Sequence, residues 1–220
     1  MDAWEIDRER VIKATHLSRK PAPKSALVAL GSVLLLFVAS AIYWSDSFGA
    51  ASLLPASRES VFSNGEYWRL VTSLLVHSDW AHFLSNAVVL GVLAFLIYGY
   101  YGPLAYPALT LVLGTLVTAI SLHTYPAETW LLGASGVVYL MAGFWLTLYL
   151  LVERRIPLKK RVVRAVGFGL IVLVPTAVEP AISYRTHLIG FVVGFGFALA
   201  YFTKQKDALR AKERIEYEYY

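Results

Sequence analysis

The sequence predicts an all-α membrane protein, a polytopic bundle of six transmembrane helices with both termini in the cytoplasm. Of its 220 residues, 57% are hydrophobic and 16% are charged, whereas soluble domains have about 25% charged residues. The charged residues leave five uncharged runs, at 25–45, 80–127, 129–152, 165–178 and 186–203. A soluble helix must present polar residues to water at each turn, so runs of this length exclude a soluble globular protein.

The number of spans follows from the lengths of these runs, because a helix needs about 20 apolar residues to cross a bilayer. The run 80–127 can hold two spans, and the sequence Tyr-Gly-Tyr-Tyr-Gly-Pro at 98–103 predicts a turn between them. The fifth span has the weakest pattern, since Arg164 and Glu179 confine it and Pro175 lies within it. The predicted spans are 26–44, 82–100, 104–122, 134–152, 162–178 and 186–203.

The basic residues predict the orientation of the bundle. They concentrate in 1–24, 154–161 and 204–214, while the other connections contain only Arg58, Arg69 and Arg185. Because cytoplasmic loops are rich in Lys and Arg, these clusters and both termini are expected inside. The net charge of +5 is thereby explained by topology and does not indicate nucleic-acid binding.

Three parts of the chain are therefore predicted. They are a cytoplasmic segment 1–24, a membrane domain 25–204 and a cytoplasmic tail 205–220. The two end segments, 1–24 and 205–220, are expected to be charged extensions that can form helix. The chain contains no cysteine, which excludes disulfides, thiolate catalysis and cysteine-based metal sites.

Four polar residues inside the predicted spans point to a functional site, because polar groups at membrane depth are costly and usually functional. Spans two, four and six all begin at the outer face. His82 and Asn86 lie in the first turns of span two, Ser135 begins span four, and His187 begins span six. At about 1.5 Å of rise per residue, all four should lie within roughly 10 Å of the outer boundary.

Each element taken alone also has a structural interpretation. The stretch 133–136 and the pair Gly190 and Gly194 could serve close helix packing. A membrane histidine is commonly a hydrogen-bonded structural group or part of a proton relay. His82 and Asn86 share one helix face and could form a polar crosslink. Packing alone, however, does not require four such residues at one depth, so their joint occurrence favours a site.

In their order along the chain, these residues resemble the rhomboid family of intramembrane serine proteases. The resemblance covers about residues 60–200, and Thr186 stands where that family usually has alanine. The matching elements are Tyr67-Trp68-Arg69 with Thr72, then His77, then His82 with Asn86, then Gly133-Ala134-Ser135-Gly136 with Tyr139, and finally His187 with Gly190 and Gly194.

The resemblance implies a Ser–His dyad without a carboxylate, with Ser135 as nucleophile and His187 as general base. The chemistry is consistent, since a serine hydroxyl needs a neighbouring base to accept its proton and histidine titrates near neutral pH. No Asp or Glu lies within predicted spans two, four or six. Tyr139, one turn after Ser135 on the same face, is therefore expected to orient the imidazole.

The tetrahedral intermediate of peptide hydrolysis also needs hydrogen-bond donors for its oxyanion. His82, Asn86 and the backbone N–H of Ser135 are the predicted donors. The supporting residues are glycines that permit a tight turn or close helix approach, namely Gly133, Gly136, Gly190 and Gly194. No metal and no cofactor is expected.

The predicted function is intramembrane serine endopeptidase activity, the hydrolysis of peptide bonds in or next to transmembrane helices of membrane-anchored substrates near the outer face. The expected partners are transmembrane protein substrates and membrane lipids, without nucleic acid. The expected location is multi-pass in a prokaryotic inner membrane, with the site open to the external or periplasmic side. The alternatives are an inactive relative that binds membrane clients, a small transporter or proton relay, and a histidine-only zinc protease.

Overall fold

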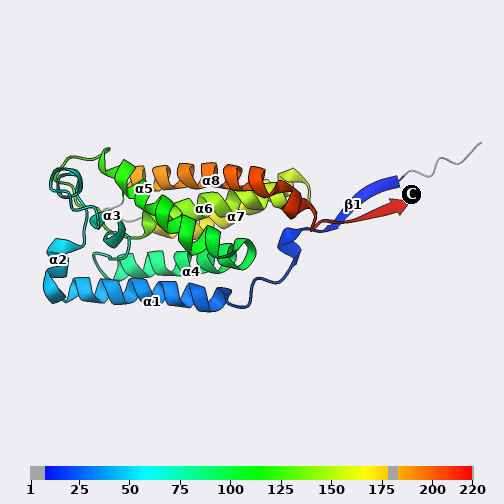
Figure 1. The fold of residues 1–220 in the computed structure, drawn as a ribbon. Coiled ribbons are helices and arrows are strands. Elements are labelled where there is room, and N and C mark those ends of the chain that lie inside the picture. The colour runs from blue at the N-terminus through cyan, green and yellow to red at the C-terminus, as the bar shows by residue number, and fades with distance from the viewer. Residues whose placement is uncertain (1–7, 178–182, 220) are drawn as a thin grey trace, which may run out of the picture.

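The computed structural model describes residues 8–177 and 183–219, which form an elongated helical bundle with a two-stranded ribbon at one end (Figure 1). The helices and strands, in chain order, are β1 (Arg8–Ala14), α1 (Ser25–Trp44), α2 (Ala50–Leu53), α3 (Arg69–Thr72), α4 (Trp80–Pro103), α5 (Thr110–Leu122), α6 (Ser135–Val152), α7 (Leu158–Ala177), α8 (Tyr184–Arg210) and β2 (Arg214–Tyr219). Short 3₁₀ turns occupy His16–Ser18 and Ser47–Gly49, and π-helical turns occupy Glu59–Ser63 and Leu104–Leu109.

Each predicted span overlaps one of the long helices α1, α4, α5, α6, α7 and α8, although α5 begins at Thr110, later than the predicted start of span three at residue 104. By length and composition, four segments of the described chain are long and apolar enough to cross a membrane: Ser25–Trp44, Trp80–Leu122, Ser135–Val152 and Tyr184–Arg210. The second of these segments contains both α4 and α5, and α7 is not among the four. The protein is thus an integral membrane protein, and the count of six spans stays a prediction. Residue 178, the predicted end of span five, lies outside the described residues.

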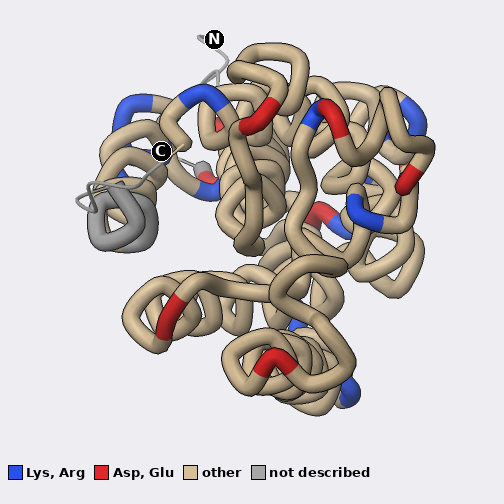
Figure 2. Tube along the Cα trace, turned by 90° about the vertical axis from the view of Figure 1, so that its left-hand side faces the viewer, with Lys and Arg blue, Asp and Glu red and all other residues tan. Residues whose placement is uncertain are grey.

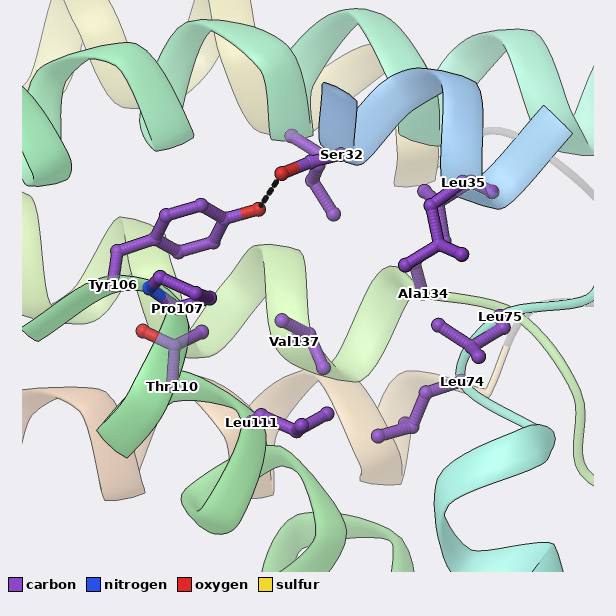
Figure 3. A pocket seen from close by; sticks show the side chains of 12 residues that line it. Ser32, Leu35, Leu74, Leu75, Tyr106, Pro107, Thr110, Leu111, Ala134 and Val137 are labelled. Carbon is purple, nitrogen blue, oxygen red and sulfur yellow. Dashed lines mark hydrogen bonds between the residues drawn. The ribbon is translucent and has the colours of Figure 1, made fainter. Parts of the chain in front are cut away.

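The helical backbone is interrupted between α4 and α5, close to the predicted turn. Gly102 has a φ of +80°, and the backbone of Tyr106 is extended, so the helix cannot continue. The Tyr106 hydroxyl donates a hydrogen bond of 2.6 Å to Ser32 Oγ on α1. Beside this bond lies an apolar cavity of about 140 Å³, whose lining includes Leu35, Leu74 and Val137 (Figure 3).

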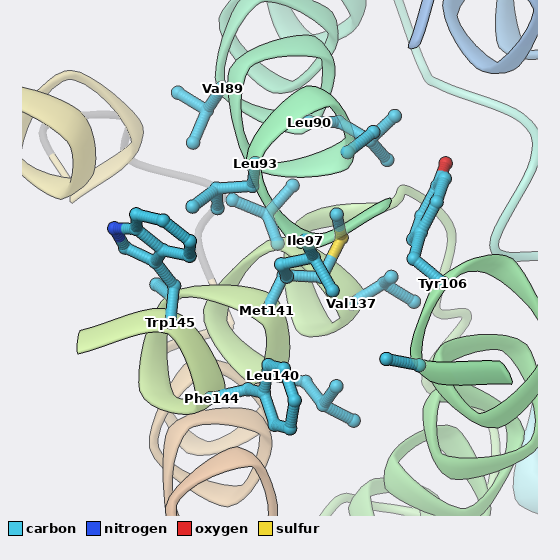
Figure 4. Packing of buried hydrophobic residues seen from close by; sticks show 14 of the residues in the cluster. Val89, Leu90, Leu93, Ile97, Tyr106, Val137, Leu140, Met141, Phe144 and Trp145 are labelled. Carbon is cyan, nitrogen blue, oxygen red and sulfur yellow. The ribbon is translucent and has the colours of Figure 1, made fainter. Parts of the chain in front are cut away.

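The core of the bundle is built around α6, which packs on α4, α5, α7 and α8. Leu140, Met141 and Phe144 of α6 are fully or almost fully buried, and they meet Leu93 and Ile97 of α4 (Figure 4). Many large apolar residues on α1, α4 and α5 are instead exposed, as expected for surfaces that face lipid. The helix that begins with Ser135 is therefore the most enclosed part of the fold.

The ends of the chain correct the sequence prediction. The helical expectation for the end segments is wrong for 8–14 and 214–219, because these residues form an antiparallel two-stranded sheet in which Ile12 pairs with Ile215. The physical reason is the alternation of charged residues with Ile or Tyr over 214–219, which matches the period of a strand. Helix α8 also continues to Arg210, beyond the predicted end of span six at residue 203.

Positive charge is distributed unevenly between the two ends of the bundle. Every Lys and Arg except Arg58, Arg69 and Arg185 belongs to the segments 8–24, 154–164 and 204–214, at the end that carries the ribbon. The opposite end, which faces the viewer in Figure 2, carries the loops 45–79 and 123–134, in which acidic and basic residues are interspersed. The basic clusters that were predicted to share one side thus lie at one end of the structure.

Candidate active site

Ser135 is the first residue of α6, and a fixed turn leads into it. Gly133 has a φ of +113°, which favours glycine, and its N–H donates to the Ser73 carbonyl at 2.8 Å. The ring of His82 lies directly against Gly133, because a Cβ at position 133 would be 2.7 Å from His82 Cε1. Glycine is therefore required here by backbone conformation and by the space that His82 occupies.

Glycines also bring α6 and α8 into direct backbone contact. A Cβ at position 190 would lie 2.3 Å from the carbonyl oxygen of Gly136, and a Cβ at position 194 would lie 2.0 Å from that of Leu140. Neither distance is compatible with a side chain. The two helices consequently run together closely from their first turns, which brings the start of α8, with His187, beside the start of α6, with Ser135.

His187 is buried at the start of α8, with 5% of its surface exposed. Ser183 caps this helix, since its side chain accepts a hydrogen bond from the Thr186 N–H. The imidazole stacks on the ring of Tyr139, with ring centroids 4.0 Å apart and an angle of 11° between the planes. Tyr139 is one turn after Ser135 on α6, so a single helix face carries the serine and the aromatic partner of the histidine.

The structure does not record a hydrogen bond between Ser135 and His187, both of which are described residues. His187 Nδ1 is buried and has no hydrogen-bond partner among the described residues. Ser135 instead lines a cavity of about 30 Å³ together with polar side chains from other elements, namely Ser73, Thr118, Ser183 and Thr186. A volume of this size, with several hydroxyl groups, is sufficient for about one water molecule.

His82 and Asn86 lie in the first two turns of α4. Asp79 caps this helix by accepting the His82 N–H at 2.9 Å, and this hydrogen bond lowers the pKa of the Asp79 carboxyl. Asn86 is 1% exposed and its Nδ2 donates to the His82 carbonyl at 2.9 Å. Because a carboxamide has two N–H donors, this bond leaves the second one available.

His77 has a structural role that the sequence did not reveal. It is completely buried, its Nδ1 lies 3.1 Å from Ser40 Oγ, and its Nε2 accepts the Ala134 N–H at 3.3 Å. Burial, with a contribution from the nearby His82, lowers the pKa of His77 to about 3, so the ring is neutral at pH 7 and can accept this bond. The residue that precedes Ser135 is thereby fixed to α1 and to the loop before α4.

The Trp-Arg element organises the loop that covers this end of the bundle. Arg69 is buried, pairs with Glu66 and donates to the carbonyls of Ser52 and Pro55, both at 2.8 Å. Ala56 in turn forms a short bridge with Leu131, just before the turn into α6. These bonds hold the loop 45–79 beside the segment that carries Ser135.

The titratable groups of the described residues show no arrangement suited to a metal ion. No group of three or more His, Asp or Glu in 8–177 and 183–219 is close enough to share one. What the geometry does provide is a hydroxyl and backbone N–H groups at a helix start and a buried imidazole. The buried carboxamide of Asn86 lies one turn along α4 from His82, whose ring contacts Gly133. Those are the components of acyl-transfer chemistry by a serine.

Comparison with known proteins assigns the sequence to a family. The family model of the Rhomboid domain matches residues 64–204, nearly two thirds of the chain. The chain belongs to the Rhomboid family. All the predicted site residues, from His82 to Gly194, lie inside the matched rhomboid region. The resemblance inferred from the sequence motifs is therefore confirmed at the level of the family.

A named rhomboid relative extends the match beyond that region. The chain is 25% identical over 190 residues to the Bacillus subtilis (strain 168) protein "Putative rhomboid protease YdcA", and the match covers 84% of this chain and 89% of that protein. The family is one of intramembrane proteases, which agrees with apolar helices that surround a polar site.

Proposed function

We propose that this rhomboid is a serine endopeptidase, which uses a Ser135–His187 dyad to cut membrane-anchored substrates in or next to their transmembrane helices. The observation that carries the proposal is the backbone contact between α6 and α8, which brings the starts of both helices together, with Tyr139 stacked on His187. Helix packing alone does not require this pair of side chains at the point of contact.

In the proposed reaction, His187 accepts the Ser135 proton as the hydroxyl attacks the substrate carbonyl, and later returns that proton to the leaving amine. Soluble serine proteases orient the imidazole with a carboxylate. Here His187 Nδ1 has no hydrogen-bond partner among the described residues. The Tyr139 ring, which stacks on the imidazole, is therefore the group available to orient it. In this proposal, the stacking of Tyr139 on the imidazole fixes the plane of the His187 ring, as a hydrogen bond from a carboxylate does in soluble serine proteases.

The oxyanion of the tetrahedral intermediate is proposed to bind the Ser135 N–H at the start of α6, the free N–H of Asn86, and His82. The Ser135 N–H belongs to the first turn of a helix, whose unpaired donors favour negative charge. The cavity of about 30 Å³ that Ser135 lines is suited to hold the water that hydrolyses the acyl-enzyme. If the water is already bound there, only the substrate peptide has to enter the site.

A serine-reactive fluorophosphonate probe tests the proposal most directly. We expect the purified protein to be labelled at one site, and we expect Ser135→Ala to remove the label while the variant melts at the same temperature. Absence of labelling in the wild-type protein would favour the inactive, client-binding alternative. Labelling that persists in Ser135→Ala would move the nucleophile to another residue.

The role of Asn86 gives a second prediction. If its free N–H stabilises the oxyanion, Asn86→Ala should lower kcat with little change in KM, because this bond strengthens only in the transition state. Loss of one such donor costs about 10²–10³ in rate in soluble proteases. We expect a smaller loss here, since His82 and the Ser135 N–H share the charge.

Ser85→Ala is the matched control for Asn86→Ala. The Ser85 hydroxyl also donates to the His82 carbonyl, at 3.0 Å, so it repeats the structural bond of Asn86 without reaching the proposed oxyanion. We expect Ser85→Ala to retain its single-turnover rate. A destabilised Asn86→Ala with a normal single-turnover rate would instead make Asn86 a structural crosslink.

Orientation is proposed from the charge asymmetry, with both termini in the cytoplasm of a prokaryotic cell and the site open to the external or periplasmic side. The chain has no cysteine, so single cysteines can report it. On intact cells, with the outer membrane permeabilised where there is one, we expect an impermeant thiol reagent to label a cysteine at Asn64 and to leave one at Lys159 unlabelled, both positions being exposed. The reverse pattern would place the site on the cytoplasmic side.

A further inference from the structure

Helix α7 is loosely packed, with cavities on two sides. One cavity, of about 640 Å³, lies among α6, α7 and α8 and includes Tyr139 and Gly169 in its lining. The other, of about 320 Å³, lies among α4, α6 and α7. Leu146 of α6 and Ala165 of α7 line both cavities. The contact between α7 and α6 is therefore a narrow strip with a cavity on each side. In a membrane, molecules other than this chain must fill these cavities.

The smaller cavity combines an apolar lining with one cationic side chain. Apart from Arg164, its lining is apolar or aromatic and consists of Leu96, Trp145, Leu146, Tyr149, Ala165 and Phe168. Its volume of about 320 Å³ lies at the lower end of the range of known ligand sites, about 300–1,000 Å³. The site thus has room for hydrocarbon beside a guanidinium group.

Arg164 has no hydrogen bond or ion pair with any residue in the described ranges, and it is exposed. Lys160, one turn earlier on the same helix face, is also exposed and has no carboxylate partner among those residues. Two neighbouring arginines differ, since Arg154 pairs with Glu213 and Arg155 with Glu153. Uncompensated positive charge is therefore concentrated on α7, beside the cavity.

The first turn of α7, which contains Lys160, adds to this excess of positive charge. The first turn of α7 contains no acidic residue, and the helix dipole already places partial positive charge there. Arg161, in the same turn, donates to the Leu150 carbonyl, while its Nε is buried without a partner in the described part of the chain. An anion at this point would offset charges that the protein itself leaves unpaired.

We propose that this site binds one anionic phospholipid, with its phosphate on Arg164 and Lys160 and one acyl chain in the cavity lined by Leu96, Trp145 and Phe168. Only an amphiphile satisfies both halves of the site, because a free phosphate would leave the apolar cavity unfilled. Basic pockets between membrane helices at a cytoplasmic surface are suited to such headgroups. The bound lipid would connect α7 to α4 and α6.

Native mass spectrometry of the purified full chain tests this proposal, after equilibration with phosphatidylglycerol and phosphatidylcholine in equal amounts. We expect the wild-type protein to retain one phosphatidylglycerol in preference to phosphatidylcholine. Arg164→Gln should weaken this binding about fivefold, the effect expected for one basic residue near a membrane surface. Arg164→Lys should retain most of the binding, because it keeps the charge.

Lys206→Gln is the matched control, since Lys206 is an exposed cation at the same end of the bundle and does not line the cavity. It should bind the lipid as the wild-type protein does. Ala165→Leu, which fills the cavity, should weaken lipid binding without removing a charge. Its melting temperature in phosphatidylcholine alone establishes that it is folded.

Four results would overturn the proposal. Equal weakening by Lys206→Gln and Arg164→Gln would mean diffuse attraction to a charged surface. Unchanged binding by folded Ala165→Leu would remove the acyl chain from the cavity. Displacement of the lipid by millimolar inorganic phosphate would make the site one for phosphate alone, and the absence of any preference for phosphatidylglycerol would remove the role of charge.

Discussion

Replacing Ser135 by alanine is expected to lower the cleavage rate of a transmembrane substrate by a factor on the order of 10⁶, the scale found for the nucleophile of a soluble serine protease. His187→Ala should lower the rate by a similar factor. The two losses should not add in the double variant, because the serine is reactive only while the histidine accepts its proton. The measurement is single-turnover cleavage in liposomes, with the melting temperature recorded beside it.

Two controls separate the chemistry from folding in this experiment. Ser135→Ala should melt near the wild-type temperature, since the Ser135 side chain has no hydrogen bond to another described residue. His187→Ala should melt somewhat lower, because it also removes the buried ring that stacks on Tyr139. A metal chelator should leave the wild-type rate unchanged, and inhibition by a chelator would revive the histidine-only zinc alternative. Substantial turnover by Ser135→Ala would refute the serine mechanism.

The second large effect is expected at Gly194, far from the reacting atoms. A Cβ at this position would lie 2.0 Å from the carbonyl oxygen of Leu140, and a backbone atom cannot rotate away as a side chain can. Gly194→Ala should therefore push α8 from α6, with a cost at or above the range of about 1–3 kcal/mol that overpacking usually carries. Displacement of His187 by even 1 Å should also lower the rate, by about 10²-fold.

Gly196→Ala provides the control, two residues further along the same helix. A Cβ at position 196 meets no atom within 4 Å, and alanine favours helix more than glycine does. This variant should be as stable as the wild-type protein or slightly more stable, with unchanged activity. If Gly194→Ala matched Gly196→Ala in both melting temperature and rate, the close contact of α6 with α8 would not be what brings the dyad together.

Much of the bundle could be predicted because apolar runs determine where membrane helices lie. The predicted spans 134–152 and 186–203 begin within two residues of α6 and α8, and these starts carry Ser135 and His187. Which end of a helix holds a residue is a local property of the chain. That local information was sufficient to select the candidate site, and the motifs around these residues carried the resemblance to the family.

Contacts between distant segments could not be predicted in the same way. The bond from Ala134 to His77 joins residues 57 positions apart, and its geometry depends on how the loop before α4 folds. The stacking of Tyr139 on His187 depends on the rotation of α6 relative to α8. The ribbon was missed for a different reason. The alternation in 214–219 was visible in the sequence, but the many charged residues of this segment led to the expectation of a solvated extension.

The ribbon joins a strand that is synthesised before the membrane helices to one that is synthesised after them. Strand β1 leaves the ribosome before the first membrane helix, whereas its partner β2 follows the last one. The pair cannot form until every helix has been synthesised, so β1 waits unpaired through the whole of membrane insertion. A ribosome that stalls before residue 214 would leave that strand edge open to other chains, so an unpaired β1 marks a chain that still lacks β2.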